Sequence, residues 1–276
     1  MNTQNNTQQP KPIFSYSWLA GIALSLTALS GAHAASTAAG LTSNVGYNEY
    51  SIAESIMETC REGNRCPDIN IKYIDTSAPW INTVINQRVD NMVVNNALNQ
   101  EDPIKGTIKK TQVQAAIDDF AKKQLTDMPK DSNLTYELDI TPSYLGHIGI
   151  TELFSIDNYA YLGGAHGMPY REYLVFDTQT KRQVTLDDML LPKQKPRFEA
   201  LAHDAYRKWV KTVTDDVASY ESSWPFSLSN NVTFDTTGMR ILYQPYDIAP
   251  YASGMPELHI PYSQLKGVIK AKYLPK

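Results

Sequence analysis

The sequence has no apolar run of about 20 residues, which is the length that a helix needs to cross a bilayer. Its longest apolar run, residues 18–30, is shorter than that and lies close to the N-terminus. Basic residues are not in excess either, since 25 Lys and Arg stand against 29 Asp and Glu. Without a basic patch that could follow a phosphate backbone, we expect neither a membrane span beyond the N-terminal segment nor a nucleic-acid partner.

Cysteine is scarce as well. The two cysteines of the chain are Cys60 and Cys66, with a Gly-Asn pair between them. Five residues separate them, which is too many for a C-x-x-C redox motif. In an oxidising compartment this arrangement predicts a local disulfide. Because the loop is short, the chain-entropy model gives a stabilisation of roughly 2 kcal/mol.

The motifs of the common enzyme classes are also absent. The sequence contains no G-x-S-x-G elbow, Walker loop or dinucleotide fingerprint. No pair of acids is placed for glycoside hydrolysis, and the histidines do not follow zinc-site spacing. The histidines beyond residue 34 are His147, His166, His203 and His259. The sequence therefore predicts no catalytic residue, no metal site and no cofactor.

The first 34 residues have the order of a secretory signal peptide. The polar start carries one positive charge, Lys11, the apolar run 18–30 follows, and Ala32-His33-Ala34 offers small residues for cleavage. This order predicts a cut after Ala34 and a periplasmic or secreted protein, with a retained N-terminal anchor as the alternative. Lys11 is the one charged residue removed, so 24 basic residues remain against 29 acidic ones.

Beyond a polar leader, residues 35–47, the hydrophobic pattern predicts helices early and strands late. A short helical stretch comes before Cys60, and apolar residues recur at helical spacing over 81–93, 113–125 and 198–209. Alternation and composition predict strands over 69–74, 134–140, 144–155, 159–162, 170–177, 184–186, 231–235, 239–244 and 257–261. Helices and strands that do not alternate regularly indicate an α+β fold with mixed or antiparallel sheets. Thr185 and Asp188 are spaced as a capping box.

The stretch from Tyr159 to Tyr170 is the most distinctive part of the sequence. Gly163, Gly164, His166 and Gly167 lie between two strand-like segments. Glycines at this density allow turns and close approaches that a residue with a Cβ does not. His166 can accordingly be a catalyst, a metal ligand or a residue that orders the turn. With no second ligand, nucleophile or paired acid nearby, we expect it to order the turn.

Tyrosine is abundant, with 17 residues in the chain. Several lie in two segments that are rich in glycine and proline, 159–170 and 243–251. Tyrosine combines a large contact area with a polar tip, which suits recognition surfaces. It is also a good strand former in a half-buried sheet, and the sequence leaves both interpretations open.

Three runs of residues together resemble the DUF3298 family. They are Tyr161-Leu-Gly-Gly-Ala-His-Gly167, the segment from Phe176 to Asp188, and Tyr243-Gln-Pro-Tyr-Asp-Ile-Ala-Pro-Tyr-Ala-Ser-Gly-Met-Pro-Glu257 with Ile260-Pro-Tyr262. The preceding region is similar to the DUF4163 domain, which is also found in the peptidoglycan deacetylase PdaC. The resemblance divides the chain after the leader into a DUF4163-like half, 48–140, and a DUF3298-like half, 141–276, which can form one compact unit.

The resemblance implies an α+β module outside the cytoplasmic membrane, similar to the extracytoplasmic domain of the anti-sigma factor RsiV. That branch binds lysozyme, so a lysozyme-type muramidase is the first partner we expect. Tyr246, Pro250 and Tyr251, with Tyr170, are the expected contact residues. The predicted signal peptide departs from an anti-sigma factor, and no deacetylase domain is appended. A hydrolase or metal-dependent enzyme acting on wall fragments through His166, and a passive peptidoglycan-binding protein, are the alternatives.

Overall fold

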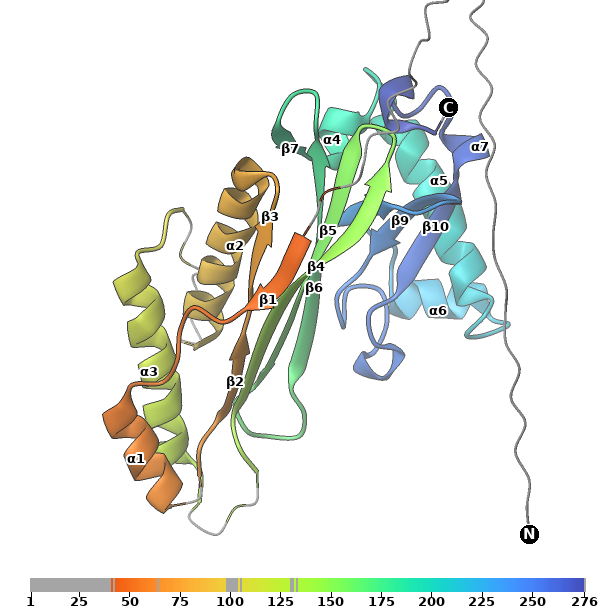
Figure 1. Cartoon of the computed structure of the whole chain (residues 1–276). Helices are drawn as coiled ribbons and strands as arrows, with labels where there is room; N and C mark the ends of the chain where they lie inside the picture. The colour runs from red at the N-terminus through yellow and green to blue at the C-terminus, as the bar shows by residue number, and fades with distance from the viewer. Residues whose placement is uncertain are drawn as a thin grey trace, which may run out of the picture. The chain divides into compact units, whose positions relative to one another are not determined.

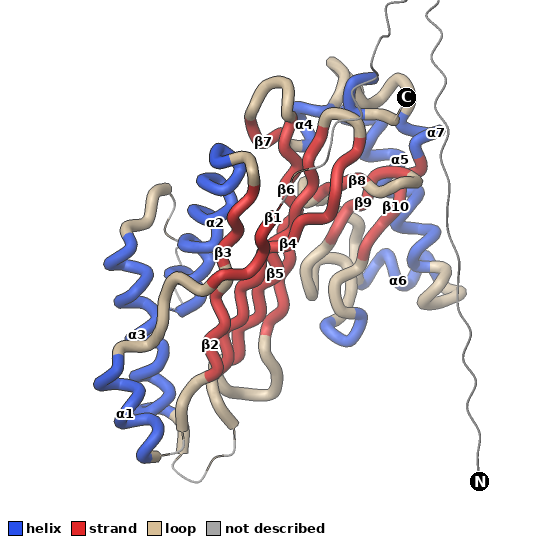
Figure 2. Tube along the Cα trace, in the orientation of Figure 1, coloured by secondary structure: helices blue, strands red, loops and turns tan. Residues whose placement is uncertain are grey.

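The computed structural model describes residues 41, 43–63, 65–97, 104, 106–129, 132 and 134–275, which belong to one compact unit. The predicted signal peptide, its cleavage site after Ala34 and most of the polar leader lie outside these residues. No helix among the described residues is long and apolar enough to cross a membrane. The fold is α+β, as predicted, and its helices and strands are shown in Figures 1 and 2.

A five-stranded sheet lies at the centre of the fold. Its order is β2-β4-β5-β6-β7, with β2 parallel to β4 and the other neighbours antiparallel. The strands are β2 (Asp68–Ile71), β4 (Glu137–Ile148), β5 (Thr151–Tyr161), β6 (Met168–Asp177) and β7 (Arg182–Val184). Position 140, where the two predicted halves meet, lies inside β4. Both halves of the sequence therefore contribute to this sheet.

Three strand predictions are wrong. The predicted strand 184–186 stops at Val184, because a helix begins at Leu186, and the other two are each divided. The predicted strand 144–155 is broken by a turn at Gly149, where φ is +59°, so that β4 and β5 form a hairpin. The second, 69–74, is divided at Lys72 because the chain changes partner there. Residues before Lys72 form β2 and pair with β4, whereas β3 (Tyr73–Thr76) pairs with β1 (Ser43–Tyr47) in a separate two-stranded sheet. Alternation of apolar and polar residues predicts each of the two divided segments as one strand. A turn divides 144–155, and a change of pairing partner divides 69–74.

Helices cover one face of the main sheet, which we call the helix side. They are α1 (Glu54–Glu62), α2 (Pro79–Ala97) and α3 (Lys110–Asp127). The predicted helical faces are confirmed, since Ile81, Ile85 and Val89 of α2 are fully buried. They share one hydrophobic cluster with Phe154 and Ile156 of β5. Even-numbered residues of β5 thus point to the helix side.

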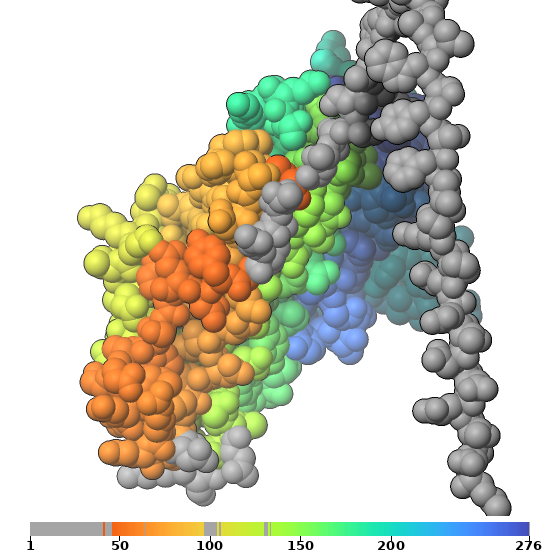
Figure 3. All heavy atoms as spheres, viewed as in Figure 1, coloured from red at the N-terminus to blue at the C-terminus, as the bar shows by residue number. Residues whose placement is uncertain are grey.

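The other face of the main sheet packs against a second sheet, and we call it the second-sheet side. This sheet has the order β10-β9-β8, formed by β8 (Val232–Phe234), β9 (Gly238–Leu242) and β10 (Glu257–Pro261). The helices here are α4 (Leu186–Met189), α5 (Lys195–Val210), α6 (Val217–Ser223) and α7 (Tyr262–Leu265), with 3-10 turns at Tyr251–Ser253 and Ala271–Tyr273. Leu153 and Val175 of the main sheet belong to this second cluster. In Figure 3 the green strands lie between the orange and yellow helix side and the blue second-sheet side.

The capping box predicted at Thr185 is present. The Thr185 hydroxyl accepts the Asp188 N–H at 3.3 Å, and the Asp188 carboxylate accepts the Thr185 N–H at 2.9 Å. Helix α6 and strand β1 have no counterpart among the predicted elements. Both are short, and neither carries a clear apolar period.

Candidate functional site

The predicted glycine-rich turn connects β5 to β6. Gly163 and Gly164 have φ values of +88° and +90°, which residues with a Cβ rarely adopt. Gly167 is required for a different reason, because a Cβ there would lie 2.4 Å from the Tyr159 ring. The turn is therefore shaped by backbone conformation at one end and by close packing at the other.

His166 and two of the predicted contact tyrosines meet on this turn. The His166 ring stacks on the Tyr251 ring, with centroids 3.8 Å apart and planes 21° apart. The Gly167 carbonyl accepts hydrogen bonds from His166 Nδ1 at 3.0 Å and from the Tyr251 hydroxyl at 2.8 Å. The Tyr246 hydroxyl lies 3.5 Å from His166 Nε2. We call His166, Tyr246 and Tyr251 the aromatic cluster.

Tyr246 projects most strongly from this cluster. Its side chain is 49% exposed, although its ring lies 5.8 Å from that of Tyr251. Its φ of +72° is uncommon for a residue with a Cβ and costs of order 1–3 kcal/mol. The turn is held by the Tyr246 N–H, which donates to Ala249 O at 3.1 Å, and by the Asp247 carboxylate, which accepts the Gln244 N–H at 2.8 Å. Pro250 is also exposed.

Tyr170 makes none of these contacts. It lies on β6, on the helix side, and lines a groove of about 590 Å³ with Arg88 of α2. Burial raises the pKa of the Tyr170 hydroxyl, and the neighbouring carboxylate of Glu172 acts in the same direction. The structure therefore separates Tyr170 from the other three predicted contact residues.

The groove lies between α2, the segment near Gly106, the start of β6 and the loop after β9. Its remaining lining residues are Asn91, Met92, Asn95, Asn96, Ile104, Gly106, Asn158, Met168, Pro169, Gln244 and Pro245. The sequence does not predict this groove, although Asn158 offers a signal. Phe154, Ile156 and Asn158 are alternate residues of β5 and point to the same face of the sheet. Asn158 is therefore a polar residue at a position where the alternation predicts an apolar one.

The edge of β6 next to the groove is closed by amide side chains. Gln244 accepts the Arg171 N–H at 3.1 Å and donates to Arg171 O at 2.7 Å. Asn231 accepts the Tyr173 N–H at 2.7 Å and also donates to Arg171 O at 2.7 Å. Since β7 pairs with β6 at residues 175–177, these amides take the place of a neighbouring strand over 171–173. They also join the second sheet to the main one.

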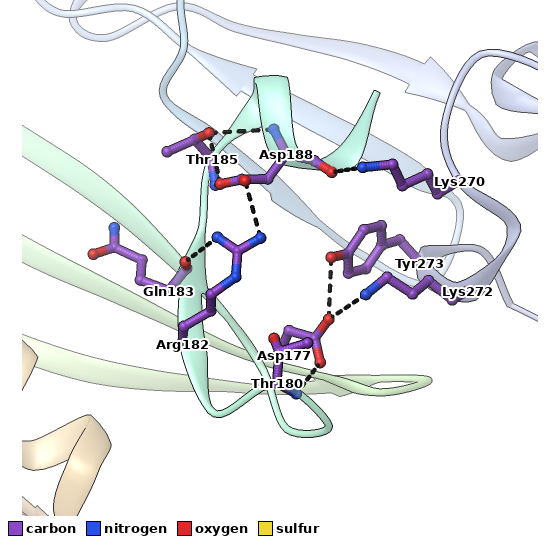
Figure 4. A network of polar contacts seen from close by, with 9 residues as sticks. All are labelled: Asp177, Thr180, Arg182, Gln183, Thr185, Asp188, Lys270, Lys272 and Tyr273. Carbon is purple, nitrogen blue, oxygen red and sulfur yellow. Dashed lines mark hydrogen bonds and ion pairs between the residues drawn. The ribbon is translucent and has the colours of Figure 1, made fainter. Parts of the chain in front are cut away.

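A polar network at the far end of β6 has a structural role (Figure 4). The Asp177 side chain is 0% exposed and accepts hydrogen bonds from Lys272 Nζ at 2.6 Å and the Tyr273 hydroxyl at 3.1 Å. Burial alone would raise the pKa of Asp177, but these bonds and two backbone N–H groups outweigh it and lower the pKa to about 2. The network ties the C-terminal segment to the sheet.

The neighbouring carboxylate of Asp188 is held in the same way. Its hydrogen bond from Arg182, at 3.0 Å, and those from Thr185 lower its pKa to about 2. Lys270 Nζ donates to the Asp188 backbone oxygen at 2.5 Å. All of these polar atoms are paired with one another, which fits a structural role rather than a binding site (Figure 4).

The chemistry available around His166 is limited among the described residues. The hydrogen-bond partners of its ring are Gly167 O and the Tyr246 hydroxyl. No group of three or more His, Cys, Asp or Glu side chains in this part of the chain is placed to hold a metal ion.

The predicted disulfide is present between Cys60 and Cys66, with a Cα–Cα distance of 4.8 Å. It links α1, which contains Cys60, to the segment before β2.

Comparison with known proteins supports the family resemblance in part. Residues 187–263 match the model of DUF3298, a protein family of unknown function. The matched segment contains Tyr246, Pro250 and Tyr251 but not His166. No curated protein matches the chain. The DUF3298 resemblance is confirmed for this segment, and the DUF4163 and RsiV resemblances stay predictions.

Two crystal structures share the fold. A DUF3298 family protein from Pseudomonas aeruginosa PAO1 has a TM-score of 0.59 and 23% identity, covering 86% of this chain and 94% of its own. A DUF3298 family member from Bacteroides fragilis NCTC 9343 has a TM-score of 0.56 and 21% identity, covering 74% and 84%. At these identities the likeness shows the fold alone.

Proposed function

We propose that the protein is a binding module of the cell envelope that recognises a second protein through the aromatic cluster and Pro250. A lysozyme-type muramidase is the first candidate partner. On this proposal the module is exported and acts without catalysis of its own. The glycine-rich turn of residues 163–167 serves as the platform on which the contact residues are held.

The observation that carries the proposal is the exposure of Tyr246 in a costly backbone conformation. An aromatic side chain that is 49% exposed gains little from burial within its own chain. Its φ of +72° lowers stability further. Residues that reduce stability in this way concentrate at functional sites, and tyrosine is enriched at protein interfaces.

Rigidity is a second support for the proposal. His166 and Tyr251 are stacked and share the Gly167 carbonyl as a hydrogen-bond acceptor. A contact surface that is already ordered loses less side-chain entropy when a partner binds. The aromatic cluster therefore has the preorganised form that a recognition surface favours.

Charge supports a basic partner. With 24 basic and 29 acidic residues beyond position 34, the net charge is 24 − 29 = −5. Complementary charge mainly accelerates association, and it does so more strongly at low ionic strength. This agrees with a basic muramidase as the first protein to test.

The proposal is tested by calorimetric titration of the purified protein with lysozyme and by an assay of muramidase inhibition. We expect saturable binding that Tyr246→Ala weakens by roughly 30-fold or more, the loss typical of an interface hot spot. The matched control is Tyr47→Ala, because Tyr47 is 44% exposed but lies on β1, outside the aromatic cluster. No heat and no inhibition at micromolar concentration would contradict the choice of lysozyme. Equal losses in both variants would contradict the choice of surface.

A further inference from the structure

The groove beside Tyr170 offers a second site, and the reasoning about it is independent of the proposed function. Its volume of about 590 Å³ lies within the range of roughly 300–1,000 Å³ that small-molecule sites occupy. It lies on the helix side of the main sheet, whereas the aromatic cluster is formed by His166 of the turn between β5 and β6 and by Tyr246 and Tyr251 of the segment between β9 and β10. A ligand of the groove would contact different side chains from a partner bound at the cluster.

The groove is close to neutral. Among its lining residues in the described part of the chain, Arg88 carries a charge, and no carboxylate is present. Arg88 Nε already donates to Glu172 Oε2 at 2.6 Å, so its charge is balanced outside the groove. A ligand that relied on its own charge would find no free counter-charge here. The arrangement favours a neutral ligand.

Asparagine residues line this neutral space, and two of them have a buried amide oxygen without a hydrogen-bond partner among the described residues. Asn158 is 8% exposed, and its Oδ1 has no hydrogen-bond partner among the described residues. Oδ1 of Asn91, on α2, is in the same state. Buried polar groups are nearly always paired, so each exception calls for an explanation. Asn91 Nδ2 donates to Gln87 O at 2.8 Å and to Gly106 O at 3.1 Å, which fixes that amide. Rotation about χ2 exchanges Oδ1 and Nδ2, so the Asn158 amide can present either an acceptor or a donor to a ligand.

The groove is poorly suited to an added peptide strand. The N–H and C=O of Arg171 and the N–H of Tyr173 are already bonded to Gln244 and Asn231. The next outward position along β6 is Pro169, which has no N–H to offer. A peptide that extended the sheet would therefore lack hydrogen-bond partners at this edge. This leaves side-chain recognition of a small polar ligand as the better match.

We infer that the groove binds a neutral saccharide. Sugar hydroxyls both donate and accept hydrogen bonds, which is what the amide of Asn158 can match. The C–H faces of a sugar ring can pack on the side chains of Met168, Pro169 and Tyr170, which provide the apolar part of the lining. A small number of polar groups set in a largely apolar wall is the usual form of a small-molecule site.

The inference is tested by following the backbone and side-chain amide signals of the isotope-labelled protein during titration with cellobiose, maltose and N,N′-diacetylchitobiose. We expect at least one sugar to shift the signals of Asn91, Asn158 and Met168 saturably at millimolar concentration or below. Because the groove is neutral, the affinity should not change when added NaCl screens surface charges. Strong salt dependence would overturn the inference.

A pair of variants separates binding from folding. Asn158→Leu should weaken saccharide binding by about tenfold or more, since a buried amide would lose its role in recognition. Its melting temperature should stay equal or rise, because an unpaired buried polar group is removed. Asn48→Leu is the matched control, since Asn48 is exposed and does not line the groove. Met168→Ala, at an exposed position, gives a second binding-defective variant without disturbing the core.

Besides strong salt dependence, three results would overturn the inference. One is the absence of saturable shifts at the groove for every sugar. Another is a response confined to Tyr246 and Tyr251, which would indicate that sugars meet the aromatic cluster instead. The third is an Asn158→Leu protein that binds sugar as well as the unmodified protein does.

Discussion

The two sides of the main sheet treat their polar residues differently. On the second-sheet side, Asp177 and Asp188 are carboxylates whose oxygens are bonded and whose pKa values are lowered to about 2. On the helix side, Asn91 and Asn158 have amide oxygens without partners among the described residues. Both sides have well-buried hydrophobic clusters, so packing does not distinguish them. The difference lies in particular groups: the acids of the Asp177 network are paired and the amide oxygens at the groove are not, although Thr233 Oγ1 on the second-sheet side also lacks a partner among the described residues.

The pKa shifts of the carboxylates also differ between the two sides. Burial raises the pKa of Asp90 on α2, although the Tyr73 hydroxyl opposes this by donating to it at 2.7 Å. Burial also raises the pKa of Glu152, which accepts a hydrogen bond from Tyr144 at 2.6 Å. These acids have neutral donors, whereas Asp177 has Lys272. The comparison teaches that the buried acid network of the second-sheet side stabilises the fold, whereas the groove on the helix side keeps unpaired amide oxygens, as a binding site requires.

The largest effect is expected for Asp177→Ala. It would leave Lys272, the Tyr273 hydroxyl and two backbone N–H groups without their acceptor, so we expect the free energy of unfolding to fall by about 3 kcal/mol. Urea unfolding at neutral pH measures this. The matched control is Asp187→Ala, because its ion pair with Lys195 is exposed and should be worth less than about 0.5 kcal/mol. Similar losses in both would contradict the stabilising role of the buried Asp177 network.

A smaller loss, about 2 kcal/mol, is expected for Asn231→Ala. The substitution leaves the Tyr173 N–H without its acceptor and opens part of the β6 edge, which joins the second sheet to the main one. Unfolding of Asn230→Ala serves as control, since Asn230 is exposed and we expect a change within about 0.5 kcal/mol. If Asn231→Ala were as stable as the control, the amides would not be what holds the sheets together.

The smallest effect is expected from pH, and its sign should differ between the two sides. The folded-state pKa of Asp177, about 2, is below the unfolded value of about 3.9, so its contribution is present above that value. It is lost as the pH falls from about 4 towards 2. The pKa of Asp90 is raised instead, so its folded state binds the proton more tightly and gains stability as the pH falls.

Urea unfolding of two variants over this pH range tests the difference in sign. The stability gap between the unmodified protein and Asp177→Asn should narrow as the pH falls below about 4. The stability of Asp90→Asn relative to the unmodified protein should be highest at neutral pH, where the buried Asp90 carboxylate of the unmodified protein is charged, and should decrease as the pH falls. Parallel pH profiles for the two variants would show that the sides do not differ in this respect.

Much of the fold could be predicted because local periodicity determines it. The apolar faces of α2, α3 and α5 are visible in the sequence, and the structure buries them. The boundaries of β4 and β5 could not be predicted in the same way. A run from Tyr144 to Ser155 alternates well enough for one strand, and its division at Gly149 becomes visible only through the hairpin that it forms.

The sequence predicts several residues of the candidate site, but it does not predict how they are arranged in space. The glycine-rich turn, Tyr246 and Tyr251 stand out in the sequence, yet nothing there shows that the Tyr251 ring stacks on His166. Tyr170 was grouped with them by composition and lies instead in the groove. The groove itself was missed, because its walls come from segments that are far apart in the chain.

By itself, the sequence determined the α+β class, the helical faces, the disulfide pair and the signature turn, since each depends on residues within a few positions of one another. The tertiary structure decided which polar groups are paired. Asp177 meets Lys272 across 95 residues, and Gln244 closes the β6 edge across 73. Hydrogen bonds need their atoms within about 3 Å, and chain folding alone brings such distant residues that close.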